Sequence, residues 1–129
     1  MSKVSVQVLC ESDIAEASRQ ARLKSKALGF ARVQRYYLAT AASELASNLF
    51  IHSGGGVLEM DEMTDRPGIA LISSDNGPGI ADVEQALEDG YSTVGGLGCG
   101  LPGVKRLMDE FIIESQVGIG TVVKAYKWL

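Results

Sequence analysis

The sequence has few cysteines, few aromatic residues and no long hydrophobic run, and each scarcity excludes a class of protein. Its 129 residues include two cysteines, Cys10 and Cys99, too few for a disulfide framework and without the spacing of a metal site. No uninterrupted apolar run approaches the roughly 18 residues that span a bilayer. The first ten residues lack the basic-then-apolar pattern of a secretory signal. We therefore expect a reduced, cytoplasmic protein with no membrane partner.

Basic residues are also fewer than acidic residues. Lys and Arg number 12 against 16 Asp and Glu, which gives a formal net charge of -4. Binding to duplex nucleic acid depends on clustered Lys and Arg, and because the bases are scattered over the sequence we expect no nucleic-acid partner. With 46% hydrophobic residues, a chain of this length is expected to form a single domain over residues 1–129 around one core.

The spacing of apolar and turn-forming residues predicts the order β-α-α-β-β-α-α-β-β. Ser12 or Asp13 is expected to cap the first helix. Hairpins separated by helices predict a two-layer α/β sandwich, in which a mixed, mostly antiparallel sheet has helices on one face. We expect strands at 3–9, 57–63, 69–75, 111–116 and 121–128. The first helix is expected to follow its cap at Ser12 or Asp13 and to stop at Gly29, and further helices are expected at 31–52, 82–88 and 102–108.

The second helix carries Glu44, Asn48 and His52 at four-residue steps, so the three side chains share one helix face. Relative to the apolar stripe of that helix, Glu44 and Asn48 are expected at the border between core and surface. In a cleft, the Glu44 carboxylate would act as a general base and the Asn48 amide oxygen would bind Mg²⁺. The alternative is polar residues on a solvated helix face, and His52 is explained equally well as a helix-ending residue.

A second candidate site follows the strand at 69–75. Asp75 is succeeded by Asn76, Gly77, Pro78 and Gly79, which are common turn formers, so an ordinary turn is one interpretation. The other is a carboxylate at a strand end, with glycines that let the backbone approach a flat ligand closely. A buried carboxylate that accepts an exocyclic amine would select adenine over guanine, because a keto oxygen there would leave it unpaired.

The segment from 95 to 103 is the richest in glycine. Consecutive glycines expose backbone N–H groups, and the helix behind them points its positive end at the loop, which favours an anion. Gly98, Gly100 and Gly103 match G-x-G-x-x-G, but no strand precedes them, so a dinucleotide site is excluded. The Gly-Lys-Ser/Thr of a Walker loop is also absent. A flexible surface loop is the alternative.

The joint pattern is more specific than its parts. Glu-x-x-x-Asn on a helix, Asp-x-Gly-x-Gly after a strand, Gly-Gly-x-Gly-x-Gly before a helix and Gly-Thr at the last strand occur in this order. The pattern resembles the GHKL (Bergerat-fold) ATP-binding family across nearly the whole chain. The stretches 88–93 and 103–111 and the ending 125–129 are similar to the RsbT-type switch kinases of the bacterial stressosome.

The resemblance implies a role for each matching residue, with ATP and Mg²⁺ as cofactors. Glu44 would be the general base and Asn48 the Mg²⁺ ligand. Asp75 would recognise adenine in a pocket shaped by Gly77 and Gly79. The phosphate lid and a further contact near adenine would come from Gly95, Gly96, Gly98, Gly100 and Thr121.

The resemblance also implies a serine/threonine protein kinase with protein partners. Its substrates would be STAS-domain antagonist proteins of the RsbS and RsbR type, and the released kinase would activate a PP2C-type phosphatase in stress signalling. One alternative is an anti-sigma factor kinase that sequesters a sigma factor and phosphorylates an anti-anti-sigma partner. A detached histidine-kinase domain and an ATP-sensing scaffold without turnover are the others.

Overall fold

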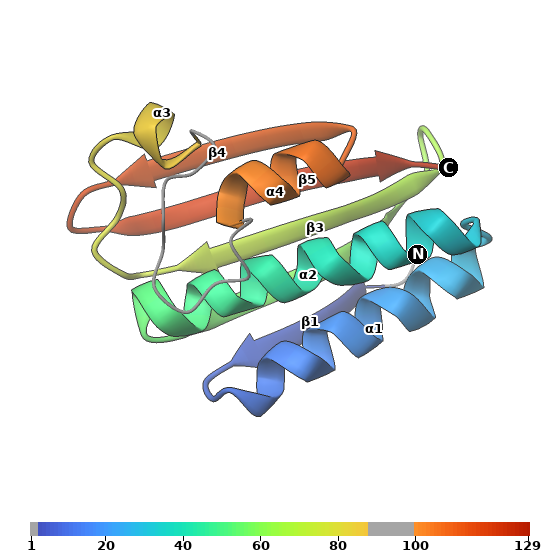
Figure 1. Ribbon diagram of the computed structural model, residues 1–129, viewed down its shortest axis with the longest axis horizontal. Coiled ribbons are helices and arrows are strands. Elements are labelled where there is room, and N and C mark those ends of the chain that lie inside the picture. The colour runs from blue at the N-terminus through green and yellow to red at the C-terminus, as the bar shows by residue number, and fades with distance from the viewer. Residues whose placement is uncertain (1–2, 88–99) are drawn as a thin grey trace.

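A computed structural model describes residues 3–87 and 100–129 and confirms the expected order of elements (Figure 1). Every boundary lies within about two residues of the one expected from periodicity, the usual uncertainty of helix and strand ends. The strands are β1 (Lys3–Val8), β2 (Gly56–Met63), β3 (Gly68–Asp75), β4 (Glu110–Gln116) and β5 (Gly120–Trp128). The helices are α1 (Ser12–Leu28), α2 (Arg32–Ser53), α3 (Val83–Ala86) and α4 (Gly100–Leu107).

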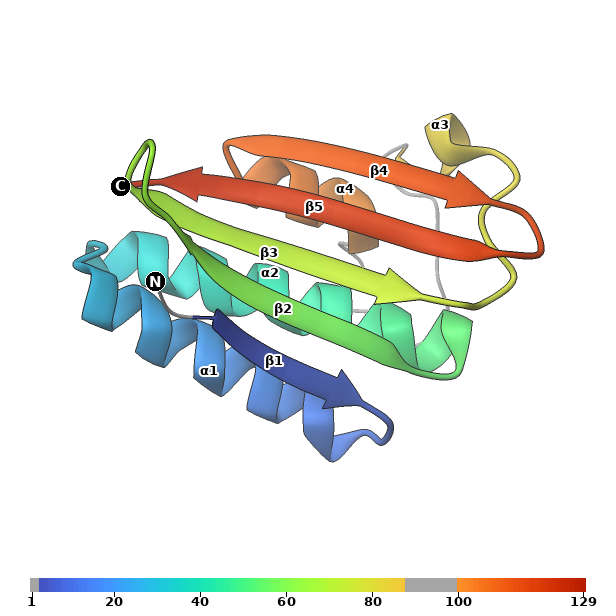
Figure 2. The ribbon, with the colours of Figure 1, turned by 180° about the vertical axis from the view of Figure 1, so that it is seen from behind.

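The five strands form one sheet in the order β1-β2-β3-β5-β4. All four neighbouring pairs are antiparallel, so the sheet is antiparallel rather than mixed over the described residues. Helices α1, α2 and α4 cover one face of the sheet, and in the described chain the other face carries no helix (Figures 1 and 2). The two-layer α/β sandwich is therefore confirmed.

The core lies between these two layers. Alternate residues of the strands point at the helices, and the apolar stripes of α1 and α2 point back at them. Leu38, Leu45, Leu58, Met60 and Leu71 are among the fully buried side chains. In the described part of the chain, no helix has both the length and the apolar character needed to cross a membrane.

The expected cap of α1 is wrong. Helix α1 begins after Glu11, and no side chain caps its first turn. Asp13 lies inside the first turn, and its side chain instead contacts the backbone that precedes the helix. Its Oδ2 accepts hydrogen bonds from the N–H groups of Leu9 at 2.9 Å and Cys10 at 3.1 Å. The carboxylate therefore fixes the β1–α1 connection, and these hydrogen bonds lower the pKa of Asp13.

Candidate active site

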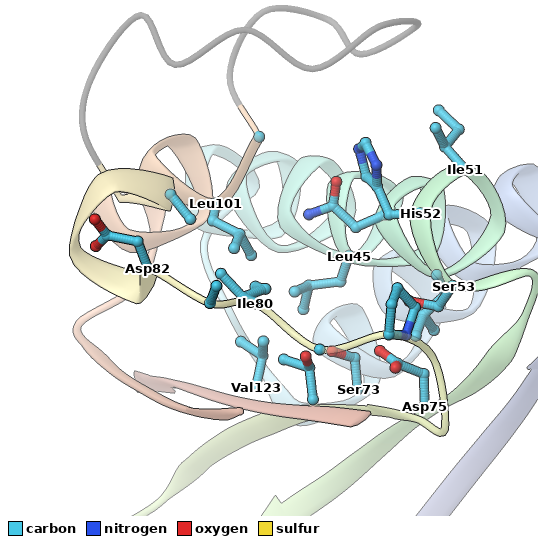
Figure 3. A pocket seen from close by; sticks show the side chains of 18 of the residues that line it. Leu45, Ile51, His52, Ser53, Ser73, Asp75, Ile80, Asp82, Leu101 and Val123 are labelled. Carbon is cyan, nitrogen blue, oxygen red and sulfur yellow. The ribbon is translucent and has the colours of Figure 1, made fainter. Parts of the chain in front are cut away.

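A cavity of about 710 Å³ opens at the carboxyl end of α2 (Figure 3). Helix α2 forms its roof, and the ends of β3 and β5 form its floor. The loop before α3 and the first turn of α4 are its walls. Its apolar lining includes Leu45, Leu49, Ile80, Leu101 and Val123. An apolar slot with a few polar groups is the usual form of a small-molecule site.

The polar part of the floor follows from strand register. Asp75 on β3 is opposite Thr121 on β5, and Thr121 is opposite Ser115 on β4. Residues opposite each other across antiparallel strands lie on the same face of the sheet. The three side chains therefore form a row on the face of the sheet that the helices cover (Figure 1). Ser73, two residues before Asp75, faces the same cavity.

The loop after β3 is held in place by its own hydrogen bonds. The Gly77 N–H donates to Asp75 Oδ1 at 2.8 Å, and the Gly118 N–H donates to the Pro78 carbonyl at 2.8 Å. Gly79 has a left-handed φ of 77°, and a Cβ there would collide with the Gln116 carbonyl oxygen. A Cβ at Gly77 would meet Ser53 Cβ on α2 at 2.9 Å and Asp75 Oδ1 at 3.0 Å. Glycine therefore lets the loop approach the end of α2 at position 77 and the end of β4 at position 79.

Ser115 ties this loop to the floor, and no sequence motif indicated it. Its Oγ accepts the Ile80 N–H at 2.7 Å and lies 2.7 Å from Thr121 Oγ1. It also lies 3.3 Å from the Gly120 carbonyl oxygen. One hydroxyl therefore joins the cavity wall to the strand that carries Thr121. Only the register of β4 with β5 could have revealed it, because Ser115 is an ordinary alternating position of a strand.

Two of the three α2 residues that are spaced four apart, Asn48 and His52, lie on the roof of the cavity and line it. In Figure 3 Leu45 points from α2 toward the strands, whereas His52 is on the side of the helix away from them. His52 is exposed and lies at the rim, so it does not contact the floor that holds Asp75.

Glu44 differs from the expectation of a border position. Its side chain is only 2% exposed and is not among the described residues that line the cavity. Burial raises the pKa of Glu44, and a hydrogen bond from the Gly100 N–H opposes that rise. The predicted border position of Glu44 was wrong because it was taken from the apolar stripe of α2, which indicates only how α2 packs on the sheet. Helix α4 packs against α2 as well, and the Gly100 N–H at its start donates to this carboxylate.

The predicted site residues divide into three groups. Asn48, Asp75, Gly79, Gly100 and Thr121 line the cavity together. Glu44 and Gly77 lie directly behind it, in contact with Gly100 and Asp75 respectively. Gly95, Gly96 and Gly98 lie outside the described residues. The residues that the sequence did not assign to the site include Ser73, Ser115, Leu45, Ile80, Leu101 and Val123.

A divalent metal would find few protein ligands here. In the described residues no group of three or more His, Cys, Asp or Glu side chains is arranged to hold a metal ion. Asn48, whose side chain carries an amide oxygen, nevertheless lines the cavity. Mg²⁺ commonly takes one or two protein oxygens and completes its shell with water and substrate phosphates. The donor set therefore fits a magnesium ion that enters with a nucleotide and does not fit a resident metal.

Comparison with known proteins agrees with this geometry. Residues 9–127 match the family described as "Histidine kinase-like ATPase domain". The chain is 47% identical over 126 residues to the serine/threonine-protein kinase RsbT of Bacillus subtilis (strain 168), covering 96% of this chain and 95% of RsbT. It is 32% identical to the anti-sigma F factor of Geobacillus stearothermophilus, over 69% of this chain and 68% of that protein.

A solved structure shares the fold at low identity. The crystal structure of the SiaB-SiaC complex from Pseudomonas aeruginosa superposes with a TM-score of 0.67 at 12% identity, covering 98% of this chain and 88% of that chain. At this identity the likeness concerns the fold alone. The match over residues 9–127 and the similarity to RsbT over nearly the full length go further: the chain belongs to the histidine kinase-like ATPase domain family.

Proposed function

We propose that this chain is a serine/threonine protein kinase that transfers phosphate from Mg-ATP to a STAS-domain antagonist protein of the RsbS and RsbR type. The observation that carries the proposal is the single cavity in which Asn48, Asp75, Gly79 and Thr121 meet. The 47% identity to the kinase RsbT over 96% of the chain supports the enzyme class. A nucleotide co-substrate and protein partners fit a cytoplasmic location.

Adenine would occupy the apolar slot above the floor. Asp75 Oδ1 is already used by the Gly77 N–H, and no described residue donates to its other oxygen. That oxygen can accept an N–H from the exocyclic amine of adenine. Guanine has a keto oxygen at the same place, which would meet the carboxylate without a proton between them. We therefore expect a preference for ATP over GTP.

The phosphates would lie toward Asn48 and the first turn of α4. Gly100 and Leu101 of that turn line the cavity, and a helix start offers N–H groups that no other residue of the helix satisfies. Gly95, Gly96 and Gly98 would complete the phosphate loop in this proposal. Asn48 would hold the Mg²⁺, whose charge offsets that of the phosphates.

Glu44 would accept the proton of the substrate hydroxyl. The hydroxyl oxygen would at the same time form its bond to the γ-phosphorus, and ADP would leave. A carboxylate has two oxygens with about four acceptor positions, so the Gly100 N–H leaves room for a second donor. Burial raises the pKa of Glu44, which brings it nearer to the operating pH and makes it a better base. The contact with Gly100 also couples this carboxylate to the helix that walls the phosphate end.

After phosphorylating its antagonist, the kinase would be released to bind and activate a PP2C-type phosphatase in stress signalling. The second candidate is an anti-sigma factor kinase, which is favoured by the similarity to anti-sigma F factors over about two thirds of the chain. That candidate requires stable binding of a sigma factor and inhibition of transcription in a reconstituted assay. The higher identity and fuller coverage favour the RsbT-type role.

Incubation of the purified chain with Mg-ATP and candidate STAS-domain proteins tests the proposal. Mass spectrometry should find phosphate on a Ser or Thr of the STAS protein. A parallel incubation with GTP should give little transfer. Phosphate on no candidate, together with tight binding of a sigma factor, would move the assignment to the second candidate.

A further inference from the structure

Charge is divided unevenly between two parts of the chain. Residues 17–43, which run from α1 into α2, contain six of the twelve Lys and Arg residues and none of the sixteen Asp and Glu. The rest of the chain therefore holds six bases and all sixteen acids. The bases are thus not scattered, as the whole-chain composition suggests, but half of them belong to one basic segment in an acidic protein.

Most of these bases point into solvent. On α1 the buried residues are Ala17, Ala21, Lys24 and Ser25, and at about 100° per residue the exposed Arg22 and Lys26 lie on the opposite side. Helix α2 repeats the arrangement, with Arg32 opposite the buried Leu38 and Leu45. Arg22, Lys26 and Arg32 form no ion pair with any residue in the described ranges. Arg19, one turn earlier, is bound to Glu16 at 2.6 Å.

Apolar side chains stand among these cations. Tyr36 is 71% exposed and Val33 is 60% exposed, and Leu23 on α1 is 48% exposed. The two helices lie side by side over the same sheet face (Figure 1), so their solvent sides form one surface. We name the residues Arg22, Leu23, Lys26, Arg32, Val33 and Tyr36 the α1–α2 surface. Tyrosine and arginine are enriched among the residues that dominate binding between proteins.

The α1–α2 surface is far from the cavity. Helix α2 has 22 residues, which is roughly 33 Å at 1.5 Å per residue. The surface occupies its amino end and the cavity its carboxyl end, at opposite ends of the molecule in Figure 1. A protein bound at the surface would therefore leave the nucleotide site accessible.

We propose that the α1–α2 surface docks an acidic protein surface of the output phosphatase, an inference that rests on the function proposed above. The substrate of phosphorylation must bring a hydroxyl to the cavity end, whereas the output protein needs no access to nucleotide. Protein fits better than nucleic acid, because three unpaired cations are fewer than the 6–10 phosphate contacts typical of DNA-binding proteins. Protein fits better than a membrane, because the apolar stripes of both helices are buried against the sheet.

The test measures binding of the full chain to a purified PP2C-type phosphatase without nucleotide, and separately to the STAS-domain substrate. The double variant Lys26→Glu/Arg32→Glu should weaken phosphatase binding about tenfold or more, chiefly through slower association with a weaker salt dependence. Tyr36→Ala should weaken it through faster dissociation. The Kd for ATP and the rate of STAS phosphorylation should stay within about twofold of the wild type.

A matched control reverses two cations on the uncovered face of the sheet. Lys124 is on that face of β5, and Arg66 lies over the Trp128 ring at 4.5 Å to the centroid. Arg66→Glu/Lys124→Glu changes the net charge as much as the first double variant does and should leave phosphatase binding nearly unchanged. Equal losses for both double variants, or none for either, would overturn the proposal.

Other occupants give distinguishable results, each of which overturns the assignment to an acidic protein partner. These are a loss of STAS binding alone, a change of oligomeric state in sedimentation, and a loss of binding to duplex DNA or to vesicles of anionic lipid at physiological salt. The phosphatase measurement needs no ATP. It therefore still tests the surface if STAS phosphorylation fails in the wild-type protein and the proposed function with it.

Discussion

The two ends of α2 are built on opposite principles. At the carboxyl end, hydrogen bonds fix polar groups of a largely apolar cavity, as where Asp75 binds the Gly77 N–H and Thr121 Oγ1 lies 2.7 Å from Ser115 Oγ behind it. At the amino end, the side chains of Arg32 and Tyr36 are exposed. Fixed groups in a closed space can discriminate between small ligands, whereas mobile charges in water act on the approach of a large partner. The same helix thus supports two kinds of recognition.

The sharpest way to break this comparison is to remove the buried carboxylate of the cavity end. Glu44→Gln keeps the size of the side chain and its acceptor for the Gly100 N–H, but it is not a base. We expect phosphate transfer to fall by about 10²–10⁴, the usual contribution of a general base, with an unchanged Kd for ATP. Single-turnover transfer and nucleotide titration measure the two quantities. Glu114→Gln, an exposed position on β4, is the matched control, and transfer at the wild-type rate would remove Glu44 from this role.

A second substitution separates nucleotide binding from chemistry at the same end. Asp75→Asn retains an acceptor for the Gly77 N–H and so preserves the turn, but it replaces the other oxygen with an NH₂ donor. That donor would face the exocyclic amine of adenine, leaving both without an acceptor. We expect the Kd for ATP to rise by about two orders of magnitude, at roughly 1.4 kcal/mol for each factor of ten. Ser74→Ala, on the other face of β3, should bind ATP normally. An unaltered Kd in Asp75→Asn would refute base recognition.

Most of the fold could be predicted from the sequence because its signals are local. Alternation of Val4, Val6 and Val8, the stripe through Leu38 and Leu45, and turn residues between segments are all set by near neighbours in the chain. The order of elements and the two-layer architecture follow from them. The antiparallel pairing of every strand does not, since it depends on which strands meet after the chain has folded.

The candidate site could be predicted only where a motif marks it. Asp75 and Asn48 belong to spaced patterns that a sequence displays. Ser115 became visible only through its register with Thr121, and the burial of Glu44 only through packing of α4 on α2. Both are long-range contacts, which a single sequence does not encode in any periodicity. The sequence also separates the charges into two blocks, yet their exposure on adjoining helices is a property of the folded layer.

A subtler change tests whether the cavity end depends on fixed geometry. Ser115→Ala removes the acceptor of the Ile80 N–H and the partner of the Thr121 hydroxyl. A donor left without an acceptor costs about 1–3 kcal/mol when buried. We expect part of that cost in stability and an increase of about tenfold in the Kd for ATP. Glu114→Ala, the preceding residue on the opposite face of β4, should change neither quantity. ATP affinity equal to that of the control would show that the cavity does not need this hydroxyl.

The smallest expected effect concerns the pH dependence of stability, and its sign differs between Glu44 on α2 and Glu16 on α1. Burial raises the pKa of Glu44, so the folded state binds its proton more tightly than the unfolded state does. The contribution of Glu44 to stability is therefore fully present below its unfolded pKa and is lost as the pH rises through its folded pKa. Glu44→Gln, which has no charge to bury, should be more stable than the wild type at pH 7, and this gain should shrink as the pH falls.

Glu16 on α1 gives the opposite sign. Its hydrogen bond with Arg19 lowers its pKa, so its contribution is present above its unfolded pKa and is lost as the pH falls through its folded pKa. Glu16→Gln should therefore be slightly less stable than the wild type at pH 7 and equal to it in acid. Urea denaturation of both variants across this pH range measures the differences, because all other carboxylates cancel in each comparison. If Glu44→Gln destabilised the protein at pH 7, the ionised carboxylate would stabilise the fold. That result would contradict a raised pKa for Glu44 and the argument that burial makes it a better general base.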